Sequence, residues 1–142
     1  MASISEKVDA EFENIIQTLN EIKKIKDVHK LSSIELGGLA AFIHNFYNGV
    51  ENILKQILKY KNVPIPNSPS WHKDLVSIAS SNNILSEKTF LSLQNFISFR
   101  HFFIHGYAVK LDPEQLVPLV ESAESTFKDF NKEILSYIAG RI

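Results

Sequence analysis

The chain has 142 residues, of which 44% are hydrophobic and 22% are charged. This length is typical of one domain, and the apolar fraction excludes a disordered protein. A formal net charge of −1 excludes a strongly basic chain that coats nucleic acid over its whole surface, but it leaves room for a local basic cleft. Cysteine is absent, which excludes disulfides, thiolate metal sites and cysteine nucleophiles.

The first residues lack the charged and then apolar pattern of a signal peptide. No apolar run approaches the roughly 18 residues that a membrane-spanning helix needs. We therefore expect one domain over residues 1–142, located in the cytoplasm and without membrane contact. Ten phenylalanines against five glycines favour long packed helices over a turn-rich β fold.

The N-terminal segment carries apolar residues at helical spacing, which predicts a first helix. Ser3 and Glu6 have the spacing of a capping box at its start. The apolar stripe consists of Ile4, Val8, Phe12, Ile15, Leu19 and Ile22. A second helix is predicted over 33–61, where Gly37 and Gly38 indicate either an irregular first turn or a close helix crossing.

Three prolines predict a loop over 62–70, followed by a short helix from Trp71 to about Ser80. The fourth helix is expected to begin after Ser86, a favourable N-cap, and to end near Gly106. Its apolar side chains surround the helix axis on most sides. This pattern predicts either a buried central helix or a helix shared between the core and an oligomer interface.

The last helix is expected to begin with Asp112 as N-cap and Pro113 as its first residue. Pro118 predicts that the first turn is a separate or kinked piece. No segment alternates between apolar and polar residues for long enough to predict a strand. The fold class is therefore all-α, a bundle of four or five helices.

Polar residues inside the apolar fourth helix are the strongest candidates for chemistry. These are Arg100, His101 and His105, with Tyr107 just beyond. A buried arginine needs an anion, a carboxylate or a solvent-filled cleft, because burying an unpaired charge is very costly. Histidine transfers protons near neutral pH, and the planar guanidinium matches phosphate oxygens. This combination suits cleavage of a phosphodiester.

The spacing alone leaves alternatives open. Arg100 and His105 are five residues apart, about 140° around an ideal helix, so they converge only if the helix ends or distorts near Gly106. A structural alternative pairs Arg100 with a carboxylate and uses the histidine as a cap. His101 and His105 have the spacing of metal ligands on one helix face, but no glutamate of the HExxH type stands beside them. We expect no metal.

Residues 100–107, RHFFIHGY, resemble the R-x4-H-x-Y motif of HepT-type toxins in the HEPN superfamily. Residues 46–54, FYNGVENIL, are similar to the second helix of that family, and residues 71–75, WHKDL, resemble a segment of some HepT-like relatives. The order of the predicted helices agrees over most of the chain, which extends the resemblance beyond the short motif.

The resemblance implies a HEPN-type homodimer that cleaves RNA, including tRNA, without metal or cofactor. It implies that His105 transfers protons, that Arg100 stabilises charge on the phosphoryl oxygens, and that Tyr107 orients phosphate. It further implies a type VII-like toxin–antitoxin pair. In such pairs a nucleotidyltransferase antitoxin of the MNT type adds AMP to the motif tyrosine, whose position Tyr107 matches.

Several other residues leave more than one interpretation. Glu51 either pairs with Arg100, assists catalysis or, as we favour, forms a surface ion pair with Lys55. Asn48 and His101 are accessory candidates. Asn48 either faces the cleft or has a polar surface role, and His101 either contacts RNA or fills a polar position at the interface. The residues expected to have structural or surface roles are His44, His72 and Trp71.

Two rival functions remain from the residues alone. The first is a HEPN domain without nuclease activity, which serves as a nucleotide-binding, RNA-binding or adaptor module. The second is a structural helical protein whose arginine and histidines satisfy polar needs of the core. The joint presence of Arg100, His105 and Tyr107 favours the ribonuclease.

Overall fold

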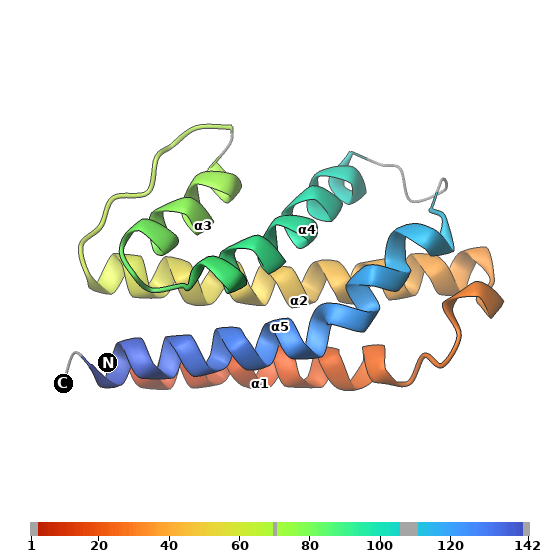
Figure 1. The fold of residues 1–142 in the computed structure, drawn as a ribbon, viewed down its shortest axis with the longest axis horizontal. Coiled ribbons are helices and arrows are strands. Elements are labelled where there is room, and N and C mark those ends of the chain that lie inside the picture. Colours follow the sequence, from red (N-terminus) through yellow and green to blue (C-terminus); the bar gives the residue numbers. More distant parts are fainter. Residues whose placement is uncertain (1–2, 70, 106–110, 141–142) are drawn as a thin grey trace.

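The computed structural model describes residues 3–69, 71–105 and 111–140. The elements in this part of the chain are α1 (Ile4–Lys23), a 3-10 turn (Val28–Lys30), α2 (Ser33–Tyr60), α3 (Trp71–Ser81), α4 (Glu87–Ile104) and α5 (Pro113–Ala139) (Figure 1). All regular structure in the described ranges is helical, and the predicted all-α bundle is confirmed. None of the described helices is long and apolar enough to cross a membrane.

Helix α2 is the centre of the bundle, since it contacts each of the other four α-helices. α1 and the C-terminal part of α5 run along α2, while α3 and α4 pack against α2 as a separate pair (Figure 1). The prediction that α4 is a buried central helix is wrong for the single chain. Its buried residues lie on one side, whereas Leu91 and Ile104 are 56% and 49% exposed.

The predicted helix starts agree with the caps in the structure. Ser3 and Asp112 each form a capping box, and the Ser86 side chain accepts a hydrogen bond from the Thr89 N–H. These side chains satisfy N–H groups that have no partner inside the helix. The short turn at Val28–Lys30 was not predicted, because three residues are too few to show a periodic pattern.

Pro118 lies within α5 and does not separate its first turn from the rest. A proline inside a helix removes one N–H donor, and the ring crowds the preceding turn. The helix nevertheless continues from Pro113 to Ala139 and changes direction along its length (Figure 1). Of the two predicted alternatives, the separate piece is therefore wrong.

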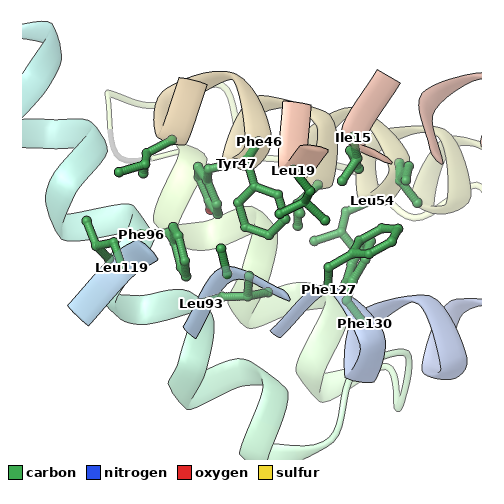
Figure 2. Close-up of a cluster of buried hydrophobic side chains, with 14 of the residues drawn as sticks. Ile15, Leu19, Phe46, Tyr47, Leu54, Leu93, Phe96, Leu119, Phe127 and Phe130 are labelled. Atoms are coloured by element: carbon green, nitrogen blue, oxygen red, sulfur yellow. The ribbon is translucent and has the colours of Figure 1, made fainter. Parts of the chain in front are cut away.

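The hydrophobic core is built from large side chains of α1, α2, α4 and α5, as Figure 2 shows. The Phe12 and Phe127 rings meet edge to face with centroids 5.8 Å apart, and Phe46 and Phe96 meet at 5.1 Å. These offset arrangements are favourable for aromatic pairs. The second contact fixes α4 against α2, which matters because α4 carries the candidate catalytic residues.

The close helix crossing lies at Gly49 and not at the two glycines that the sequence suggested. A Cβ atom on Gly49 would lie 2.5 Å from Cγ1 and 2.9 Å from Cδ1 of Ile15 on α1. By contrast, a Cβ on Gly37 or Gly38 would meet nothing within 4 Å, and both residues lie in regular helix. Only glycine at position 49 lets α1 and α2 approach this closely.

Gly49→Ala is expected to lower the free energy of unfolding by about 1–3 kcal/mol, because the added methyl group overpacks the contact with buried Ile15. Gly38→Ala in the same helix is the matched control. It is expected to raise stability by up to about 1 kcal/mol, since alanine favours helix and the space is open. Urea denaturation followed by circular dichroism measures both. Equal effects at the two positions would contradict the assigned crossing.

Candidate active site

A groove of about 740 Å³ runs between α3 and the C-terminal part of α4 and brings most of the predicted site residues together. Arg100, His101 and His105 all line it. His72 and Lys73 of α3 line it as well, and neither was predicted as a site residue. The remaining lining residues are Pro69, Ile97, Ser98 and Ile104.

Arg100 and His105 share one groove near the end of α4. The helix stops at Ile104, and His105 is its C-cap with φ −86° and ψ 14°. Ile97, His101 and Ile104 line the groove between the two side chains, so the groove follows a broad face of α4 that includes both Arg100 and His105. Arg100 is half-buried and His105 is exposed. The His101 and His105 rings meet edge to face with centroids 4.3 Å apart.

The groove is suited to an anion. Among the described residues, its lining has one arginine, one lysine and three imidazoles, and no carboxylate. Within the described part of the chain, Arg100 forms no ion pair, and its buried Nε has no hydrogen-bond partner. The structural alternative, a pair between Arg100 and a carboxylate, is therefore absent from the described residues. A phosphate matches the charge and the geometry of a guanidinium.

Glu51 corrects one prediction. The expected surface pair with Lys55 is wrong, because Glu51 is only 2% exposed and points towards α3. His72 Nδ1 lies 2.8 Å and 3.0 Å from its two carboxylate oxygens. The Lys55 ammonium instead lies 4.2 Å from the centre of the Trp71 ring, a cation–π contact. Glu51 and Lys55 therefore each contact a residue of α3, and they do not pair with each other.

His72 is the functional candidate that the sequence analysis missed. Its partner Glu51 lies 21 positions earlier on another helix, so no local spacing could reveal the contact. The stretch WHKDL, residues 71–75, resembles a segment of some HepT-like relatives, but that resemblance assigned no role to His72. The expected role was structural or at the surface. The structure places His72 in the groove and against a buried carboxylate, which argues against the surface role.

A polar cluster on α2 lies behind the groove. Burial lowers the pKa of His44, and the positive charges of Arg100 and His72 lower it further. Burial raises the pKa of the Tyr47 hydroxyl, and the negative charge of Glu51 adds to that effect. The Tyr47 hydroxyl is near Glu51, but no described residue is its partner in hydrogen-bond geometry. His44 and Tyr47 are thereby held neutral beside the charged residues.

The other predicted residues include Asn48 and Tyr107. Asn48 lines a different, polar groove of about 480 Å³ between α1 and α2. Tyr107 lies outside the described residues. No group of three histidine, aspartate or glutamate side chains in the described ranges is arranged to hold a metal ion, so the His101 and His105 pair has no third ligand there.

A helical bundle with arginine and histidine in one groove at the end of α4 is the arrangement expected of a HEPN-type protein. A family model described as HepT-like protein matches residues 38–140, from α2 to the end of α5. The chain belongs to this HepT-like family of the HEPN superfamily. No curated protein and no solved structure matches the chain. Family membership supports a HEPN-type toxin ribonuclease as the functional class.

Proposed function

We propose that the chain is a metal-independent ribonuclease and the toxin of a type VII-like toxin–antitoxin pair. The observation that carries the proposal is the shared groove of Arg100 and His105. In the part of the chain that the structure describes, its lining has cationic and imidazole side chains and no carboxylate. Membership of the HepT-like family supports the same class of activity. An alternative is a HEPN module that binds RNA or nucleotides without cleaving them, and the experiment below distinguishes the two.

Two side chains divide the chemistry in this proposal. The Arg100 guanidinium binds the scissile phosphate and stabilises the negative charge that builds on its oxygens. His105 transfers a proton at the ribose 2′-hydroxyl or at the leaving 5′-oxygen. The exposed position of His105 at the end of α4 supports this role, because RNA can reach it. His101, in ring contact with His105, is proposed to touch the RNA backbone.

The proposal includes a homodimer in the cytoplasm. Two copies would concentrate the positive potential of two Arg100 side chains, which lets a chain of net charge −1 hold RNA. The exposed apolar side chain of Ile104, beside the groove at the end of α4, supports an interface at that end of the helix. An antitoxin of the nucleotidyltransferase type is proposed to add AMP to Tyr107, where negative charge and bulk would oppose the RNA phosphate.

Cleavage of bulk RNA and tRNA in EDTA tests the proposal. The wild type is compared with an Arg100→Ala/His105→Ala double variant that has passed through the same purification, which controls for contaminating nuclease. Circular dichroism establishes equal folding, and mass spectrometry establishes that Tyr107 carries no AMP. We expect fragments on a denaturing gel with the wild type alone.

Two outcomes would contradict the proposal. Intact RNA together with a retarded band in a native gel would favour the binding module. Cleavage that stops in EDTA and returns with zinc or magnesium would contradict a metal-independent mechanism.

A further inference from the structure

The contact between His72 and Glu51 joins a groove residue to a buried acid. Glu51 lies on α2 and is 2% exposed, and His72 lies on α3 with its side chain 18% exposed. Both carboxylate oxygens lie within 3.0 Å of Nδ1. A buried carboxylate is costly unless it is paired and hydrogen-bonded. The imidazole satisfies this need and is itself held in one orientation.

The hydrogen bond also determines which ring nitrogen is available. An ionised carboxylate only accepts hydrogen bonds, so Nδ1 carries the hydrogen and donates it to Glu51. In the neutral ring, Nε2 then carries the lone pair and can accept a proton. A carboxylate on Nδ1 orients the proton-accepting histidine of serine proteases in the same way. Nε2 of His72 is therefore the basic atom left to a ligand of the groove.

Cleavage of RNA by its own 2′-hydroxyl needs two proton transfers. One proton leaves the 2′-hydroxyl as its oxygen attacks phosphorus, and another joins the 5′-oxygen as its bond to phosphorus breaks. Two positioned groups perform these transfers better than one, because each must be in the correct protonation state at the start. The groove that holds Arg100 and His105 also holds His72.

We propose that His72 is a second catalytic residue, the general base, and that Glu51 is the positioning residue that holds it; this inference rests on the proposed ribonuclease function. Nε2 of His72 takes the 2′-hydroxyl proton while the 2′-oxygen bonds to phosphorus. Protonated His105 gives its proton to the 5′-oxygen, whose bond to phosphorus breaks. The products are a 2′,3′-cyclic phosphate and a 5′-hydroxyl, and exchange with water restores both imidazoles.

His72 is preferred over His101 because the structure orients it. The His101 ring is exposed and packs against His105, and no carboxylate lies against it among the described residues.

His72→Asn separates catalysis from structure. The asparagine amide can keep an N–H near the position of Nδ1, and hence the bond to Glu51, but it has no atom in place of Nε2. We expect this variant to fold and to cleave RNA at least about 100-fold more slowly. His29→Asn is the matched control, since His29 is exposed, pairs with Glu114 and does not line the groove. Cleavage by His72→Asn at the wild-type rate would overturn the inference.

A substrate with sulfur in place of the 5′-oxygen assigns the two roles. The thiolate leaves without protonation, so this RNA should largely restore cleavage by His105→Ala and should not restore cleavage by His72→Asn. Restoration of His72→Asn alone would overturn its role as base. If the wild type cleaves neither RNA, the proposed function has failed; if His105→Ala is slow and His72→Asn is normal, only this inference has failed.

Glu51→Gln provides a second test, which distinguishes a positioning role of Glu51 in catalysis from a purely structural role. Its amide oxygen can still accept the hydrogen bond from Nδ1, but the negative charge beside the ring is lost. We expect cleavage to slow by about 10-fold or more, and the acid limb of the pH–rate profile to move to lower pH. An unchanged profile in a folded Glu51→Gln protein would overturn the positioning role, whatever the fate of His72→Asn.

Discussion

Replacing His105 with alanine is expected to slow RNA cleavage by about 10²–10⁴-fold, the range that a positioned proton-transfer group contributes. The substitution should leave the fold intact, because the His105 side chain is exposed at the end of α4. Initial rates on a fluorescent RNA between pH 5 and 9, in EDTA, measure the effect. We expect a bell-shaped pH profile from the wild type, and the residual rate of the variant should lose one limb of it.

His29→Ala controls for the general loss of an imidazole. His29 is also exposed, but it contacts Glu114 of α5, with Nε2 and the carboxylate oxygen 3.2 Å apart. We expect wild-type rates from this variant. If His105→Ala retained more than about a tenth of the activity, proton transfer by His105 would be rejected. The groove would then act without proton transfer by His105.

Phe46→Ala is expected to lower the free energy of unfolding by about 3–5 kcal/mol, the usual cost of removing a buried aromatic ring. Phe46 is fully buried at the centre of the core, and its ring centroid lies 5.1 Å from that of Phe96 on α4 (Figure 2). The loss would loosen α4 against α2, the two helices that carry Arg100 and Glu51. Urea denaturation measures the change.

Phe42→Ala is the matched control for this substitution. Phe42 lies one turn earlier on α2 and is 37% exposed at the rim of the groove between α1 and α2. We expect it to cost about 1 kcal/mol or less, as for surface positions. Similar losses at both positions would show that Phe46 does not occupy the core as described.

The helices could be predicted because their signals are local. Apolar spacing and N-cap side chains act within one or two turns, and the structure confirms them at Ser3, Ser86 and Asp112. The role of α4 could not be predicted in the same way. The sequence of an apolar helix shows how much apolar surface must be buried, but it does not show which helix packs against that surface. In this chain the central helix is α2, which contacts the other four α-helices.

The candidate site was predictable only where it lies on one helix. Arg100, His101 and His105 were found because they interrupt an apolar run on α4. Glu51 and His72 come from different helices, and the local rule of residues four apart pointed Glu51 towards Lys55 instead. Gly49 was missed for the same reason, since the crowding that requires glycine comes from Ile15 on α1.

The family match begins at residue 38, after α1, yet α1 is part of the packed core. Five side chains of α1 are buried, and Gly49 on α2 leaves room for one of them, Ile15. The five are Val8, Phe12, Ile15, Leu19 and Ile22. The residues that match the family model therefore leave out α1, which completes the hydrophobic core. A chain that began at residue 38 would lack α1 and would expose the apolar face of α2 that α1 covers. The bounds of the family match are therefore a poor guide to where this protein can be truncated.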